Sequence, residues 1–92
     1  MVDTVRDDPA RSRFELDVDG VVAFVSYRRR ADGAIELLHT ETPAAARGRG
    51  IASKLLAGTL ATIRARGLKV VPYCSFVRAY IAKHPETRDL LA

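Results

Sequence analysis

Two closely spaced glycines, Gly48 and Gly50, are the residues whose spacing most directly indicates chemistry. They follow a short apolar run, Ile35 to Thr40, and precede a segment whose apolar residues recur at the three- and four-residue steps of one helix face. Such a strand-to-helix turn presents unpaired backbone N–H groups at the positive end of a helix dipole. Because glycine has no Cβ, a phosphate can approach the backbone closely. The stretch from Arg47 to Ala52 therefore predicts an anion-binding loop.

Cys74 is the second feature that could take part in a reaction. As the single cysteine, it cannot form an internal disulfide. It stands between a β-rich run that ends at Tyr73 and a helical pattern that starts near Phe76. A helix N-terminus lowers the pKa of a thiol and so favours the nucleophilic thiolate. The other interpretation is a small buried hydrophobic residue, since free cysteine is among the most buried residue types. The residues alone leave both open.

The composition predicts one small soluble domain: 92 residues, 48% hydrophobic and 28% charged. We expect a flexible N-terminus over residues 1–11 that contributes little, followed by the domain at 12–92. No apolar run approaches the roughly 20 residues of a membrane span, and the start is too polar for a signal peptide, so a cytoplasmic protein without membrane contact is expected. With two histidines and one cysteine there is no zinc pattern, and no metal is expected.

The net charge of +4 favours anionic partners but is low for a dedicated nucleic-acid binder. Three consecutive arginines, Arg28, Arg29 and Arg30, could clamp phosphate, but at a strand end before a turn they are more often a solvated edge. Few aromatic residues and no basic stripe also count against nucleic acid. That function is therefore the least favoured.

The elements that position these residues follow from the hydrophobic pattern. Three antiparallel strands are predicted, over Phe14–Val18, Val21–Tyr27 and Ala34–Glu41. The first two are joined by Asp19-Gly20, a two-residue link typical of a tight hairpin, and Ala31 to Gly33 make the next turn. A helix is expected from about Gly50 to Arg66, with Gly67 as its C-cap.

A short β-rich run, Leu68 to Tyr73, follows that helix, and a right-handed crossover should make it the parallel neighbour of the strand at 34–41. Pro72 predicts an edge position or broken pairing, which would splay the strand end and admit a ligand. A helix over Phe76–Lys83 should end at His84-Pro85, and Glu86 to Leu91 could add a final turn.

Three phosphate-binding patterns compete for the glycine turn. A Walker A loop is excluded because Lys54 is preceded by Ser53 and followed by Leu55. The dinucleotide fingerprint has Ser53 at its third glycine position, and no acidic residue follows at the required distance. The pattern that fits is [RQ]-x-x-G-x-[GA], met by Arg47, Gly50 and Ala52. In these residues the chain resembles the GNAT superfamily of acetyl-CoA-dependent N-acetyltransferases.

The resemblance extends over residues 14–91, through His39 to Pro43, Val70 to Phe76 and His84 to Glu86. It is closest to the minimal single-domain branch of the superfamily. It implies an α/β fold: an antiparallel meander plus one parallel splayed strand, one long crossover helix and short C-terminal helices. Full-length GNAT enzymes have two helices between their first strands and further strands after the last helix, both serving acceptor binding. This chain has the direct Asp19-Gly20 hairpin instead.

By that resemblance, the backbone after the third predicted strand would hold the pyrophosphate of coenzyme A. The implied cofactor-binding residues are Arg47, Gly48, Arg49, Gly50, Ile51, Ala52 and Ser53, with Thr40, Glu41 and Thr42 along the pantetheine arm. Lys54 and Lys83 could also contact phosphates, although solvated lysines on helices are common.

Acetyl transfer requires a base that deprotonates the amine. It also requires a group that either protonates the departing thiolate or takes its place on the acetyl group. The resemblance makes Cys74 a candidate acetyl acceptor and gives Tyr80 the position of the general-acid tyrosine, although a tyrosine on a helix face is often core. His39 could be the base, although a strand histidine is more often packed and hydrogen-bonded. Glu41 and Glu36 are alternatives, and strict alternation places only Glu36 on the face opposite His39.

The expected function is acetyl-CoA binding with N-acetyl transfer to an unidentified amine, on a small molecule or a protein, through a ternary complex or through acetyl-Cys74. The alternative is a coenzyme A-binding or protein-interaction module without transfer. A monomer or weak homodimer is expected.

Overall fold

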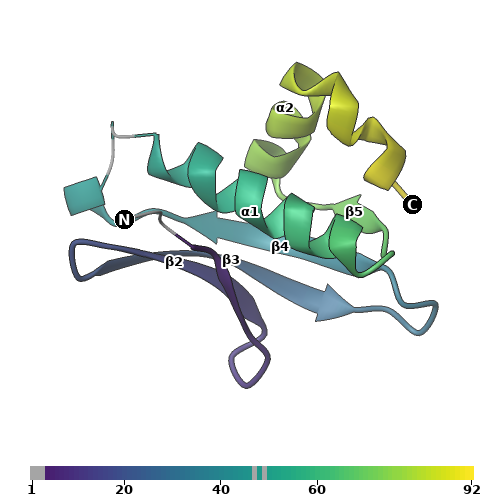
Figure 1. Ribbon diagram of the computed structural model, residues 1–92, viewed down its shortest axis with the longest axis horizontal. Helices are drawn as coiled ribbons and strands as arrows, with labels where there is room; N and C mark the ends of the chain where they lie inside the picture. Colours follow the sequence, from purple (N-terminus) through teal and green to yellow (C-terminus); the bar gives the residue numbers. More distant parts are fainter. Residues whose placement is uncertain (1–3, 47, 49) are drawn as a thin grey trace.

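The computed structural model describes residues 4–46, 48 and 50–92, which form a five-stranded mixed sheet with helices on one side (Figure 1). The strands are β1 (Arg6–Asp8), β2 (Arg13–Val18), β3 (Val21–Arg29), β4 (Ile35–Glu41) and β5 (Val70–Pro72). The helices are η1 (Ala44–Ala46), α1 (Ile51–Ala65), α2 (Ser75–Lys83) and η2 (Pro85–Leu90), where η marks a 3₁₀-helix. The sheet order is β1-β2-β3-β4-β5; β1 to β4 are antiparallel and β5 is parallel to β4. The predicted meander with one parallel edge strand is confirmed.

The core lies between the sheet and α1, which crosses it diagonally (Figure 1). The apolar helical face predicted from the sequence is buried: Ile51, Leu55, Leu56, Leu60 and Ile63. It packs against alternate residues of the strands, Phe14, Leu16, Val25 and Leu37. The Asp19-Gly20 hairpin is confirmed, with φ of 53° and 79°, the positive values that such a turn requires. Among the residues that the structure describes, no helix is long and apolar enough to cross a bilayer.

The N-terminal segment differs from the expectation of a loose end. Residues 6–8 form an edge strand paired with β2, with Asp7 opposite Phe14. The Asp7 carboxylate accepts a hydrogen bond from the Tyr27 hydroxyl at 2.7 Å and one from Arg66 at 2.8 Å. Polar composition concealed this strand, because its stabilising partners lie far away in the sequence. The segment is part of the fold and ties the sheet to the end of α1.

A β-bulge at Leu38 interrupts the alternation of β4. Tyr27 pairs with Leu37, but the preceding residue, Ser26, pairs with His39, so Leu38 has no opposite residue in β3. Leu37 is fully buried, whereas Leu38 is 36% exposed.

The bulge changes which side chains share a face. Ser26 and Arg28 lie on one face of β3, and their partners are His39 and Glu36. His39 and Glu36 therefore both lie on the face of the sheet away from α1, called the open face below. The expected placement of Glu36 opposite His39 is wrong, because alternation holds only within an unbulged strand.

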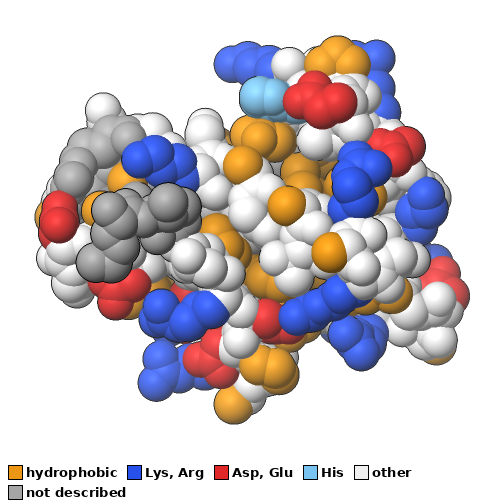
Figure 2. Space-filling view, in the orientation of Figure 1, with side chains coloured by type: hydrophobic (Ala, Val, Ile, Leu, Met, Phe, Trp, Pro, Cys, Tyr) orange, Lys and Arg blue, Asp and Glu red, His pale blue; other side chains and the backbone are white. Residues whose placement is uncertain are grey.

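Basic side chains are spread over the molecule. Figure 2 shows the helix side, where Lys and Arg side chains are interspersed with acidic and uncharged ones and form no continuous stripe. At the predicted arginine run, Arg28 Nε binds Glu36 Oε1 at 2.5 Å and Arg30 is 3.1 Å from Asp32. These pairings favour the solvated-edge interpretation of that run.

Candidate active site

The candidate site begins where β4 and β5 part. Their pairing runs from Ile35–Val70 to Leu37–Pro72 and stops there. The Leu37 carbonyl accepts hydrogen bonds from the backbone N–H groups of Tyr73, at 3.0 Å, and Cys74, at 3.2 Å. Pro72, which has no N–H to donate, and the bulge at Leu38 fall at the same level of the sheet. The chain therefore leaves β5 and enters α2 beside the half of β4 that pairs with β3 but not with β5.

Cys74 is the N-cap of α2, and its half-buried side chain packs against the core. Its Sγ lies 3.5 Å from Oγ1 of Thr40, which belongs to the half of β4 that does not pair with β5. Burial alone would raise the pKa of the Cys74 thiol, but hydrogen bonds from the Thr40 side chain and from the backbone N–H groups of Val77 and Phe76 outweigh it. The net pKa is lowered, so the thiolate is favoured although the side chain is partly buried.

Both glycines of the glycine turn have backbone conformations in the left-handed region. Gly48 and Gly50 have φ of 80° and 69°, and a Cβ placed on either would meet no atom within 4 Å. The space beside the backbone is therefore open to a ligand. Gly50 is the N-cap of α1, supplies no side-chain cap, and is followed by a first turn without acidic residues. The helix N-terminus thus keeps its positive field for an external anion.

The side chains of this loop have unequal access to a ligand. Ile51 is 3% exposed in the core, so only its backbone can contact a ligand. Ser53 is exposed and lines a cavity of about 190 Å³ with Phe76, Ala79, Tyr80, Lys83 and His84. Arg47 and Arg49 lie outside the described residues, and their predicted roles stay predictions.

Tyr80 lies on the side of α2 that faces this cavity. Its ring stacks on His84 with centroids 4.0 Å apart. Burial and, to a smaller extent, the negative charge of Glu86 raise the pKa of Tyr80, so its hydroxyl keeps its proton. Tyr80 lies six positions after Cys74, which corresponds to about 9 Å along a helix axis. The structure therefore does not bring the predicted proton donor and the predicted nucleophile together.

His39 and Glu41 form a second polar pair, on the open face. His39 Nε2 is 2.6 Å from Glu41 Oε2, and both side chains are exposed. Thr40 lies between them in sequence and points to the opposite face, toward Cys74. Glu36 is 5% exposed and bound by Arg28, which leaves His39 and Glu41 as the accessible candidates for the base.

Two features of this region escaped the sequence interpretation. Exposed hydrophobic side chains surround the parting strands: Leu38, Tyr73 and Phe76. Arg78 donates to the carbonyls of Pro72, at 3.3 Å, and Tyr73, at 2.5 Å, and so holds the segment that leads to Cys74. The only available signal was an arginine four residues after the cysteine, which is too common to be informative. Among the residues that the structure describes, no cluster of histidine, cysteine and carboxylate side chains could hold a metal ion.

Comparisons with known proteins identify the fold and the family. The solution structure of a GCN5-like protein from Staphylococcus aureus has a similar fold, with a TM-score of 0.67 and 22% identity over 96% of this chain and 86% of that one. Protein NATD1 from Mus musculus and from Homo sapiens is 31% identical over 83 residues, which cover 88% of this chain and 76% and 74% of theirs. The sequence model of the GCN5-related N-acetyl-transferase family matches residues 13–90. The match spans both the parting strands and the glycine turn, and the chain therefore belongs to the GCN5-related N-acetyltransferase family.

Proposed function

We propose that this domain binds acetyl-CoA and transfers the acetyl group to an amine, with Cys74 as the intermediate acceptor. The observation that carries this proposal is the position of the Cys74 thiol beside Thr40, where β4 and β5 part. Members of this family generally use acetyl-CoA, and the same strand, β4, leads from Thr40 to the glycine turn. Both ends of an extended thioester could therefore be contacted along one path.

The proposed binding mode uses backbone groups for the anion. The N–H groups of Ile51, Ala52 and Ser53 would hold the pyrophosphate at the N-terminus of α1. The residues from Thr40 to Thr42, beyond the part of β4 that pairs with β5, would lie along the pantetheine arm. Lys83 and Ser53, which line one cavity, would contact the remaining phosphate.

The proposed chemistry begins with the Cys74 thiolate. Its sulfur attacks the acetyl carbonyl, the thioester C–S bond breaks, and coenzyme A leaves as a thiolate while acetyl-Cys74 forms. The acceptor amine then attacks acetyl-Cys74, and the Cys74 thiolate leaves again. The proton that the amine loses goes to the departing Cys74 thiolate or to solvent, because the candidate base His39 lies on the face of the sheet opposite Cys74. The contacts of Cys74 support this route over direct transfer, in which Tyr80 would protonate the leaving thiolate of coenzyme A.

Intact-mass analysis after incubation with acetyl-CoA, without an acceptor, tests the proposal. We expect the protein to gain one acetyl group, and Cys74→Ala to gain none while its melting temperature still rises with coenzyme A. If coenzyme A raises the melting temperature but no acetylated protein appears, the domain binds the coenzyme without acetyl transfer through Cys74. The acceptor would then be sought by adding amines to the acetylated protein and following the loss of the acetyl group.

A further inference from the structure

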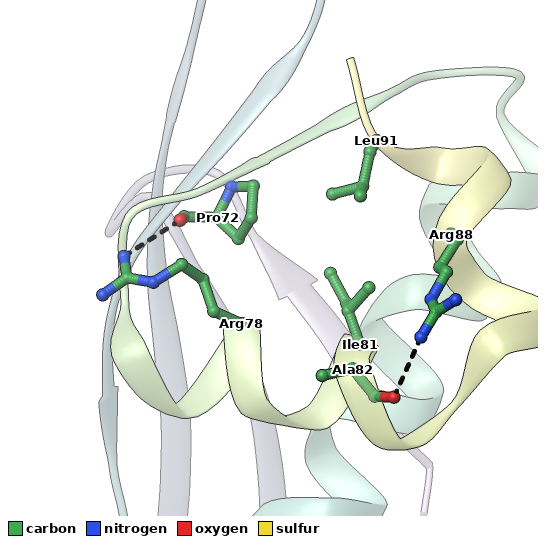
Figure 3. Close-up of a pocket in the computed structure, with 6 residues that line it drawn as sticks. All are labelled: Pro72, Arg78, Ile81, Ala82, Arg88 and Leu91. Carbon is green, nitrogen blue, oxygen red and sulfur yellow. Dashed lines mark hydrogen bonds between the residues drawn. The ribbon is translucent and has the colours of Figure 1, made fainter.

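A cavity of about 290 Å³ opens on the outer side of β5 and α2, and no step of the proposed reaction uses it (Figure 3). Its walls come from the end of β5, from α2 and from the C-terminal segment: Pro72, Arg78, Ile81, Ala82, Arg88 and Leu91. Figure 3 shows Ile81 and Leu91 between Arg78 and Arg88, with Pro72 beside Arg78. Leu91 is 40% exposed, so part of this apolar lining is open to solvent.

The two arginines are held in place without neutralising partners. Arg78 donates to the backbone carbonyls of Pro72 and Tyr73, and Arg88 donates to the carbonyl of Ala82 at 3.4 Å. Within the described part of the chain, no carboxylate lies within ion-pair distance of either guanidinium. By contrast, the guanidinium of Arg64 forms an ion pair with Asp89, with Nη1 2.6 Å from Oδ2. Each guanidinium keeps further N–H groups for an external acceptor.

The cavity shares Pro72 and Arg78 with the segment that leads to Cys74, but it lies on the other side of α2 from the cavity that Ser53 lines. With 3.6 residues per turn, Arg78, Ile81 and Ala82 lie on one side of α2, whereas Phe76 and Tyr80 lie on the other. The latter two line the cavity next to Ser53. A ligand in the outer cavity would therefore leave the glycine turn and its approach clear, and the inference does not depend on the proposed acetyl transfer.

We propose that this outer cavity binds a short acidic segment of a partner protein, with one compact apolar side chain between carboxylates that reach Arg78 and Arg88. The volume lies at the lower limit of small-molecule pockets, about 300 Å³, and suits a single side chain. Two positive groups on opposite sides of an apolar centre match an acidic–apolar–acidic sequence, whereas a small acid with one carboxylate reaches only one of them. Arginines beside an apolar anchor pocket are also typical of residues that dominate binding energy in interfaces.

The test is a titration of the full chain with the peptide acetyl-Glu-Glu-Leu-Glu-Glu-amide, followed by NMR chemical shifts and calorimetry. We expect saturable binding with shifts at Ile81, Ala82 and Leu91, unchanged by saturating coenzyme A. Arg88→Gln, which removes one weak contact and should fold normally, should weaken binding at least fivefold, and Arg78→Gln with Arg88→Gln more than twentyfold. Arg29→Gln, an equal charge change at the exposed end of β3, should leave the affinity within twofold.

Three results would overturn the proposal. One is equal weakening by Arg29→Gln, which would show a general charge effect. Another is equal affinity for a peptide with serine in place of leucine, which would show that the apolar centre is not used. The third is isovalerate binding as tightly as the peptide, which would identify a small-acid site instead.

Discussion

Thr40 Oγ1 lies 3.5 Å from Cys74 Sγ across the point where β4 and β5 part. Thr40 belongs to the half of β4 that does not pair with β5, and Cys74 is the N-cap of α2, so the contact exists because the strands diverge there. The contact also explains how a half-buried thiol can have a lowered pKa. Burial opposes ionisation, and Thr40 together with the first N–H groups of α2 reverses that effect.

The first prediction concerns the pH dependence of Cys74 alkylation. Because the thiolate is the reactive form and the pKa is lowered, the rate with iodoacetamide should rise at a lower pH than for free cysteine in the same buffer. Thr40→Val keeps the shape of the side chain but removes its hydroxyl, so its profile should move to higher pH. Stopped-flow alkylation across pH 6 to 10 measures both. If the rate for the wild-type protein rises at the same pH as for free cysteine, or at a higher pH, the effect of burial on the pKa dominates.

The second prediction concerns the glycine turn. Gly50→Ala should reduce the melting shift caused by coenzyme A, because its Cβ enters the open space beside the helix N-terminus. The substitution also strains the backbone, since φ is 69°.

Gly67 supplies a matched control for that strain. Its φ is 71°, a Cβ there would meet no atom within 4 Å, and it lies beyond the other end of α1. Each substitution should lower the free energy of unfolding by about 1 to 2 kcal/mol. Only Gly50→Ala should weaken coenzyme binding, as measured by calorimetry. Equal affinities of the two variants would remove the glycine turn from the binding site.

The order of the main elements could be predicted from the sequence because each has a local signal. Asp19-Gly20 between alternating apolar runs indicates a hairpin, and the apolar residues from Ile51 to Ile63 show helical spacing. Pro72 correctly indicated an edge strand, because a missing N–H is a property of the residue itself.

The features that escaped prediction depend on contacts between distant residues. The bulge at Leu38 follows from its pairing with β3, and two adjacent leucines do not show which one is displaced. The strand Arg6–Asp8 is stabilised by Tyr27 and Arg66, which a polar N-terminal sequence does not reveal. The separation of Tyr80 from Cys74 likewise depends on where α2 begins and how it packs, and the sequence only indicated that both residues belong to this region.

The third prediction follows from the contact between Tyr27 and Asp7. Burial and the Asp7 hydrogen bond raise the pKa of Tyr27 to about 12, whereas the pKa of a tyrosine in the unfolded chain is about 10. The native state therefore holds this proton between these values and the unfolded chain releases it. The stabilisation is complete below pH 10, and the free energy of unfolding should fall as pH rises from there toward 12.

Tyr27→Phe should lose about 1 kcal/mol of stability at pH 7, because the hydrogen bond to Asp7 is gone. Its stability should then decline less steeply above pH 10. Urea denaturation at pH 7, 9, 10 and 11 compares the two proteins. Identical alkaline slopes would show that the Tyr27 proton is not linked to folding.

The last prediction concerns the close approach of Val5 to Gly58, where the N-terminal segment crosses α1. A Cβ on Gly58 would lie 2.3 Å from Val5 Cγ2 and 2.7 Å from Val5 Cβ. In an isolated helix, replacing glycine with alanine is favourable by about 1 kcal/mol. Here the clash involves the branched Cβ itself, so the segment must move, and overpacking of this kind costs about 1 to 3 kcal/mol. Gly58→Ala should therefore be neutral or destabilising.

A double-mutant cycle separates the two effects. Val5→Gly removes the three atoms nearest to the new Cβ, so Gly58→Ala should become stabilising in that background, by up to about 1 kcal/mol. Thermal and urea denaturation of the four proteins give the coupling free energy directly. If Gly58→Ala stabilises the protein equally with valine or glycine at position 5, the N-terminal segment does not pack against α1 in solution, and the expectation of a loose N-terminus would be restored.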